Sequence, residues 1–147
     1  MSVFHFRWWA LAVLAVLLVA SVSNRALAGS QAVKQIIVPG EDRFTPFAVT
    51  VHVGQKVQWF NNDSDDHDVI SVDALNTAGH KGVNHLLQPG DTFSLKFTHP
   101  GVFPFYCDFH SQLDAHNQPK APGPFGGIQD PNGNFGTPMS GVVTVIP

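Results

Sequence analysis

The feature that most constrains the fold of this chain is a series of short β-type segments separated by turn signals. Apolar and polar residues alternate in several segments, and Pro-Gly or Gly-Gln sequences stand between them. The predicted strands are residues 31–38, 47–53, 56–60, 69–72, 92–97, 102–107 and 141–146. Residues 74–86 leave room for one helical turn, but no useful 3.6-residue periodicity appears after residue 28. The pattern predicts an all-β sandwich or barrel.

The N-terminus has the features of a secretory signal. Arg7 supplies a positive charge, residues 8–20 are almost wholly apolar, and an A-x-A cleavage pattern ends at Ala28. The apolar run is shorter than the roughly 20 residues that a membrane-spanning helix needs, although a retained N-terminal anchor stays open as an alternative. We therefore predict a signal peptide at residues 1–28 and one domain at residues 29–147. The expected location is periplasmic or secreted, with no stable membrane span after cleavage.

The charge balance narrows the range of partners. Residues 29–147 carry six lysine and arginine side chains against eleven aspartates and glutamates, a net charge of −5 with neutral histidines. This balance argues against a nucleic-acid groove and favours a protein partner with a basic docking face. Several aspartates surround His67, namely Asp63, Asp65, Asp66 and Asp68. They form either a solvated loop or a cluster that favours a cationic metal and steers a basic partner, an effect that salt would weaken.

Cys107 is the only cysteine, so the chain cannot form an internal disulfide. An unpaired cysteine in a secreted protein indicates a reactive thiol, an intermolecular bond or a metal ligand. His110 follows three residues later, and His67 and Met139 also stand near the ends of predicted strands. A thiolate and two imidazoles in a plane, with a weak axial thioether, make a blue-copper electron-transfer site. Structural zinc is the rival, but zinc sites of that kind often have several cysteines.

The sequence resembles the cupredoxins, of the plastocyanin, pseudoazurin and amicyanin kind. The matching segments are Trp-Phe-Asn-Asn at 59–62 with His-Asp-Val at 67–69, Gln-Pro-Gly at 88–90, Pro-Gly-Val-Phe-Pro-Phe-Tyr-Cys-Asp-Phe-His at 100–110, and Met-Ser-Gly-Val at 139–142. The resemblance implies a cupredoxin-like Greek-key β-sandwich that binds one type 1 copper ion. It also implies His67, Cys107, His110 and Met139 as the copper ligands, with the backbone N–H of Asp68 hydrogen-bonded to the cysteine sulfur.

The sequence departs from the family in the copper-binding loop. Cupredoxins usually bring the axial methionine within a few residues of the second histidine. Here an insertion, residues 111–138, separates His110 from Met139, and it has five glycines, five prolines and no predicted strand. Closure entropy grows slowly with loop length, so the insertion does not forbid the site. We favour Met139 because Met-x-Gly-Val before a terminal strand is the family's own ending. Gln112 or no residue as the axial ligand, and His116 in place of His110, stay open.

The first functional hypothesis is a periplasmic electron carrier that cycles between Cu(I) and Cu(II) and passes single electrons between redox protein partners. In cupredoxins the exposed edge of the second histidine is the usual exit for the electron, which nominates His110. One alternative is a copper-binding protein for copper handling, which would need extra soft ligands. Another is a cupredoxin-derived enzyme with an open copper site, in which water takes the place of Met139. An electron carrier is preferred to an enzyme, and no catalytic residue is assigned.

Overall fold

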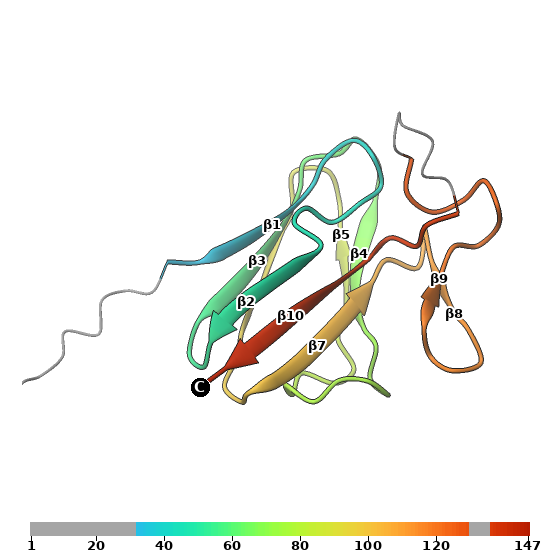
Figure 1. Ribbon diagram of the computed structural model, residues 1–147. Helices are drawn as coiled ribbons and strands as arrows, with labels where there is room; N and C mark the ends of the chain where they lie inside the picture. The colour runs from blue at the N-terminus through green and yellow to red at the C-terminus, as the bar shows by residue number, and fades with distance from the viewer. Residues whose placement is uncertain (1–31, 130–135) are drawn as a thin grey trace, which may run out of the picture.

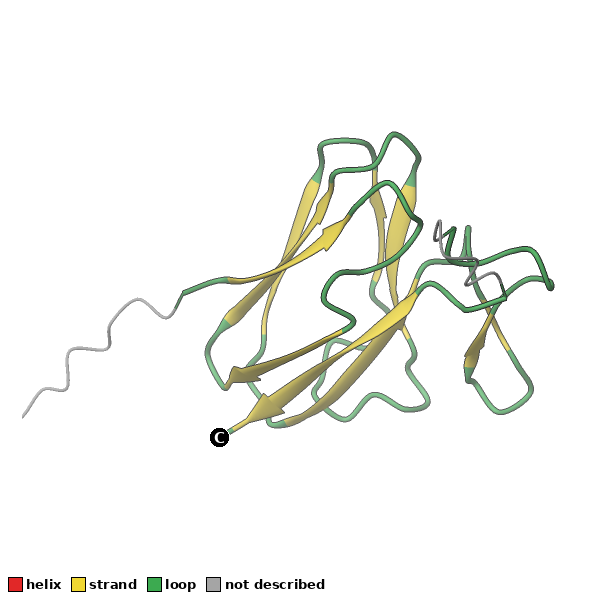
Figure 2. Cartoon of the chain, turned by 45° about the horizontal axis from the view of Figure 1, so that its top comes forward, coloured by secondary structure: helices red, strands yellow, loops and turns green. Residues whose placement is uncertain are grey.

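Strands and loops make up the part of the chain that the computed structural model describes, residues 32–129 and 136–147. Their ten strands form two sheets and a small separate hairpin (Figures 1 and 2). These two ranges contain no helix, and therefore none of the length and apolarity that a membrane crossing requires. The predicted signal peptide, residues 1–28, lies outside the described residues, so it stays a prediction.

Eight strands build the sandwich. Their bounds are β1 (Lys34–Val38), β2 (Ala48–His52), β3 (Lys56–Asn61), β4 (His67–Ser71), β5 (Asn84–Leu87), β6 (Thr92–Lys96), β7 (Gly101–Tyr106) and β10 (Ser140–Ile146). The smaller sheet has the order β1-β3-β6, with β3 parallel to β1 and antiparallel to β6. The larger sheet has the order β2-β10-β7-β4-β5, in which only the β2–β10 pair is parallel. This order confirms the predicted all-β, Greek-key sandwich.

Side chains that alternate along the strands fill the space between the two sheets. Trp59 of β3 is fully buried, and its ring lies edge-on to that of Phe105 of β7 at a centroid distance of 5.2 Å. Phe103 is also fully buried and makes an edge-to-face contact with Phe97 at 5.3 Å. Val102, the residue before Phe103 in β7, is exposed. The two-residue period that predicts β7 therefore also separates its core face from its outer face.

The structure confirms the seven predicted strands, with shifted ends, and adds β5. The prediction that residues 74–86 can hold one helical turn is wrong, because the structure has no helix there. Gly79, His80 and Gly82 have φ angles of 82°, 59° and 72°, which a right-handed helix excludes. The Asp73 carboxylate accepts a hydrogen bond from the Gly82 N–H at 2.9 Å and closes this loop. The chain therefore turns here and returns as β5 alongside β4.

The insertion, residues 111–138, contains a short hairpin where the sequence analysis expected no strand. In it β8 (Gln112–Leu113) pairs with β9 (Pro119–Lys120), beside the sandwich (orange in Figure 1). The Asp114 carboxylate accepts hydrogen bonds from the backbone N–H groups of His116 and Gln118, each at 2.8 Å. A side chain that binds the backbone of a turn, rather than an alternating strand pattern, stabilises this hairpin. Residues 130–135 of the insertion lie outside the described residues.

Phe103→Ala should lower the free energy of unfolding by about 3–5 kcal/mol, the usual cost of truncating a fully buried aromatic side chain. Val102→Ala is the matched control on the outer face of the same strand, and should cost about 0.5 kcal/mol. Urea unfolding of the copper-free protein, followed by tryptophan fluorescence, measures both. Equal costs for the two variants would contradict this assignment of the faces of β7.

Candidate metal centre

Three neighbouring strands bring the predicted ligands to one end of the larger sheet. Cys107 directly follows β7, Met139 directly precedes β10, and His67 is the first residue of β4. Ser140 pairs with Tyr106 across the antiparallel strands β10 and β7. One residue further, the Cys107 N–H donates a hydrogen bond to the Met139 carbonyl oxygen at 3.0 Å. The long insertion therefore leaves Met139 directly opposite Cys107.

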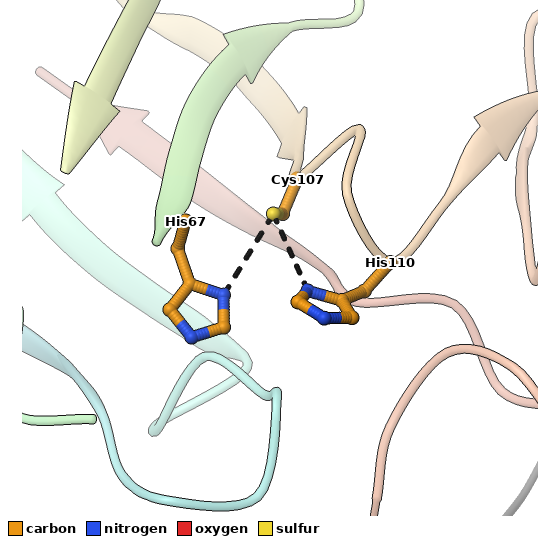
Figure 3. Close-up of side chains that lie close together, drawn as sticks. All are labelled: His67, Cys107 and His110. Atoms are coloured by element: carbon orange, nitrogen blue, oxygen red, sulfur yellow. Dashed lines mark hydrogen bonds between the residues drawn. The ribbon is translucent and has the colours of Figure 1, made fainter. Parts of the chain in front are cut away.

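Cys107, His67 and His110 direct one donor atom each toward a common point (Figure 3). The Cys107 Sγ lies 3.8 Å from Nδ1 of His67 and 3.7 Å from Nδ1 of His110, and the three donor atoms lie within 4.8 Å of one another. His67 and Cys107 are fully buried, whereas the side chain of His110 is 18% exposed. The two rings thus approach the sulfur through the same kind of nitrogen.

These separations fit a metal ion that all three atoms bind. For a trigonal ion with bonds of about 2.3 Å to sulfur and about 2.0 Å to nitrogen, the sulfur and each nitrogen would lie about 3.7 Å apart. One thiolate with two imidazoles is the trigonal ligand set of copper electron-transfer sites. Structural zinc sites more often use several cysteines. The donor set therefore fits copper.

Of the residues considered for the axial position, Met139 has its backbone beside that of Cys107, whereas Gln112 does not have this contact. Met139 is fully buried, and its carbonyl oxygen accepts a second hydrogen bond, from the Ser111 hydroxyl, at 3.0 Å. Gln112 is exposed on β8, and His116 is exposed in the turn between β8 and β9. His110, rather than His116, is the histidine whose ring lies beside the Cys107 sulfur.

The surroundings of Cys107 keep its thiol protonated in the absence of a metal. Burial raises the pKa of this thiol to about 12, and the negative charge of the Asp68 carboxylate acts in the same direction. Backbone N–H groups of Asp68 and Phe109 hydrogen-bond the sulfur and lower the pKa, but by less. The contact from the Asp68 N–H is the one that the resemblance to the family implies. Because the thiolate is the metal-binding form, metal binding must release this proton.

Asp68 is a buried carboxyl group next to that sulfur. Burial, and after it a hydrogen bond with the Asp108 carboxyl, raise the pKa of Asp68 to about 7. The Asp108 N–H donates a hydrogen bond to Asp68 Oδ1 at 2.9 Å, which favours the ionised form and partly offsets the rise. In the copper-free protein the Asp68 carboxyl therefore holds its proton into the neutral pH range.

Carboxylates also contact the outer nitrogens of both imidazoles. His67 Nε2 lies 3.1 Å from Asp63 Oδ2 and 3.8 Å from Asp42 Oδ1, and His110 Nε2 lies 3.4 Å from the same Asp42 oxygen. Burial lowers the pKa of His110 and raises that of Asp42, while their mutual attraction opposes both shifts. Sequence reasoning placed Asp63 near the site but missed Asp42, which stands 25 residues before His67 with no motif around it.

Asn61 organises the loop that carries the acidic residues and leads to His67. This side chain is fully buried at the end of β3, and its amide nitrogen donates hydrogen bonds to the carbonyl oxygens of Asp65 and Leu87, at 2.8 and 2.9 Å. Its amide oxygen accepts the N–H of Asp63 at 2.9 Å. One amide thus satisfies three backbone groups and sets the path of the chain into β4.

Comparison with known proteins agrees with this geometry. Residues 10–116 match the family model of the cupredoxin-like domain. A chloroplastic plastocyanin of Physcomitrium patens is 32% identical over 101 residues, which are 63% of this chain and 60% of that protein, so the chain spans less than two thirds of this relative. A purple cupredoxin from Nitrosopumilus maritimus has a TM-score of 0.51 at 26% identity, over 77% of this chain and 99% of its own. The Cu(I) form of an amicyanin variant, with a TM-score of 0.53 at 20% identity over 78% of this chain and 82% of its own, shares the fold.

Asn61→Ala should destabilise the copper-free protein by about 2–4 kcal/mol, because it leaves buried backbone groups without their hydrogen-bond partners. Asn62→Ala, at the exposed neighbouring position, is the matched control and should change stability by about 0.5 kcal/mol or less. Urea unfolding measures both variants. A cost for Asn61→Ala no larger than that of its neighbour would show that the amide does not organise this loop.

Asp68→Asn should raise the melting temperature of the copper-free protein more at about pH 8 than at about pH 5. The pKa of Asp68 is raised from 3.8 to about 7 in the folded chain. The contribution of this group to stability is therefore greatest at acid pH and falls as the pH rises through this window. Asparagine cannot ionise and lacks this loss. Thermal melts against pH, with exposed Asp66→Asn as the control, should show a widening gap for Asp68→Asn alone, and parallel curves would rule out the raised pKa.

Proposed function

Because this chain belongs to the cupredoxin family, we propose that it is a type 1 copper protein that transfers single electrons between redox proteins. The observation that carries the proposal is the convergence of the Cys107 sulfur with Nδ1 of His67 and of His110, at 3.8 and 3.7 Å, at one end of a β-sandwich. Membership in the family confirms two predictions made from the sequence, the cupredoxin-like sandwich and one copper ion as the cofactor.

Four side chains would hold the copper ion in this proposal. His67 and His110 would supply two imidazoles, Cys107 a thiolate and Met139 a thioether, which are the ligand types of copper electron-transfer sites. The family-model match covers the first three residues and ends at residue 116, so the support for Met139 is its burial opposite Cys107. When bound, copper supplies a one-electron couple between Cu(I) and Cu(II).

The scaffold keeps the ligands in place and excludes water from them. Cys107 and Met139 are tied by a backbone hydrogen bond, His67 belongs to β4, and all three are fully buried. A dry, preorganised site needs little rearrangement when the charge of its metal changes, and solvent access is one of the factors that set its potential. His110 keeps 18% of its side chain exposed. It is therefore the ligand through which we expect electrons to enter and leave.

Two other functions are less well supported. An enzyme with an open copper site needs a coordination position that substrate or water can reach, whereas Met139, whose backbone is hydrogen-bonded to that of Cys107, has no exposed surface. A copper-handling protein would need further soft ligands, and Met139 is the only methionine after Met1. The electron carrier is the function that these residues support best.

The charge of the chain bears on its partner and location. The net charge of −5 on residues 29–147, with exposed Asp65 and Asp66 close to His67 in the sequence, favours a redox partner with a basic docking face. Salt should weaken such an encounter. A periplasmic or secreted location rests on the signal-like residues 1–28.

Visible absorption and EPR spectra of the Cu(II)-loaded protein test this function. The wild type should show an intense thiolate-to-copper band, narrow copper hyperfine splitting and a reversible one-electron wave in voltammetry. Cys107→Ser should lose the band, and Met139→Leu should shift it. His116→Ala, which changes an exposed histidine of the insertion, is the control and should match the wild type.

Absence of the thiolate band from the wild type would reject the type 1 copper site. An unshifted band in Met139→Leu would show that the insertion supplies another axial ligand or leaves the position open, and would move support to the open-site enzyme.

A further inference from the structure

We propose that Asp42 is a positioning residue of the copper site: its carboxylate lies against Nε2 of His110 and of His67 and keeps the proton of each ring on that nitrogen, so that each Nδ1 is free for the metal. The role belongs to a buried residue of the loop between β1 and β2, outside the ligand set. This inference rests on the copper site of the proposed function.

Asp42 lies on the side of both rings that faces away from the sulfur. Its Oδ1 is 3.4 Å from Nε2 of His110 and 3.8 Å from Nε2 of His67. Figure 3 shows both Nδ1 atoms pointing at the Cys107 sulfur and both Nε2 atoms pointing away from it. Asp42 is 4% exposed, so little water competes with the imidazoles for its carboxylate.

A carboxylate selects the tautomer of an imidazole because, when ionised, it can only accept a hydrogen bond. The ring nitrogen that faces it therefore carries the proton, and the opposite nitrogen keeps the lone pair that binds a metal. In both His67 and His110 the nitrogen on the Asp42 side is Nε2, and the nitrogen on the Cys107 side is Nδ1. A carboxylate that faces the protonated nitrogen of a metal-binding histidine orients the ring and raises its basicity.

The two histidines depend on Asp42 to different degrees. His67 Nε2 has a second and closer carboxylate, Asp63, at 3.1 Å. Among the residues that the structure describes, Asp42 is the only carboxylate within 4 Å of His110 Nε2. Loss of Asp42 should therefore remove the preference of His110 for the Nε2–H tautomer. His67 should keep its original tautomer.

A hydrogen bond from the insertion helps to stabilise the turn that carries Asp42. The residue has a φ angle of 49°, in the left-handed region that aspartate and asparagine adopt more readily than most residues. Ile37 and Thr45, which stand on the two sides of the turn, exchange two backbone hydrogen bonds of 2.7 and 2.8 Å. Directly before Asp42, the Glu41 carbonyl oxygen accepts the N–H of Gln129, a residue of the insertion, at 3.0 Å. The insertion thus helps to hold Asp42 against the two rings.

The charge of Asp42 should also lower the reduction potential of the site, because a nearby negative charge stabilises the more positive oxidation state of the metal. Asp65 offers a matched comparison. It is an exposed aspartate of the acidic loop that lies within electrostatic range of His110. Removal of its charge therefore tests long-range electrostatics without a contact to the ring.

The first measurement is the tautomer of each histidine by ¹⁵N NMR of the copper-free protein at neutral pH. Asp42→Asn keeps an oxygen acceptor, whereas Asp42→Gly removes the side chain, and both residues tolerate a positive φ. His110 should be in the Nε2–H form in the wild type and in Asp42→Asn, and should populate both tautomers in Asp42→Gly. His67 should keep one form in all three proteins.

The second measurement is the reduction potential after copper loading, which should rise in Asp42→Asn by more than in Asp65→Asn. An unchanged His110 tautomer in Asp42→Gly, together with equal potentials for Asp42→Asn and Asp65→Asn, would overturn the proposal. The NMR measurement needs no copper. A wild type without a thiolate band would thus reject the proposed function while the tautomers still decide the role of Asp42.

Discussion

The pairing of β7 with β10 and with β4 determines where the metal centre lies. Hydrogen bonds between the strands set a register, and one step beyond its last residues the Cys107 N–H meets the Met139 carbonyl oxygen. His67 begins the strand on the other side of β7. Cys107, Met139 and His67 are thus positioned by the ends of three adjacent strands. The length of the loop between His110 and Met139 has no part in this placement. This is why an insertion is compatible with the ligand geometry of a short loop.

Burial is the second constraint, because it concentrates ionisable groups where water cannot screen them. The Cys107 thiol, the Asp68 carboxyl and the Asp42 carboxylate all lose solvent at the same end of the sandwich. Each has a specific partner there: backbone N–H groups, a second carboxyl, or an imidazole. In a region of low dielectric constant such partners matter more than they would at the surface. The same desolvation that protonates the free thiol would strengthen its attraction to a bound cation.

Much of this arrangement could be predicted from the sequence, since the strands follow a two-residue period and the motifs around His67, Cys107 and His110 are local. The sequence favours Met139 as the axial ligand but leaves alternatives open. The register of β10 places the backbone of Met139 opposite that of Cys107. Asp42 could not be found, because its role depends on a left-handed turn and on contacts with residues distant in sequence. The β8–β9 hairpin could not be predicted for a similar reason, since it is stabilised by hydrogen bonds from backbone N–H groups to the Asp114 side chain. The positive φ angles of the residues near Gly79 likewise could not be predicted from helical periodicity.

The position of β10 has a consequence for how the chain reaches its native state. This last strand lies between β2 and β7, and it pairs Val142 with Ala48, far earlier in the chain. Contacts between such distant segments slow folding, because chain entropy is lost before they form. Met139 can meet Cys107 only after this strand has docked, so the full ligand set exists only in the completed fold. An ion that needs all four side chains would bind the native state alone and shift the equilibrium toward it by mass action. Copper would then secure the C-terminal strand in the sheet, in addition to carrying an electron.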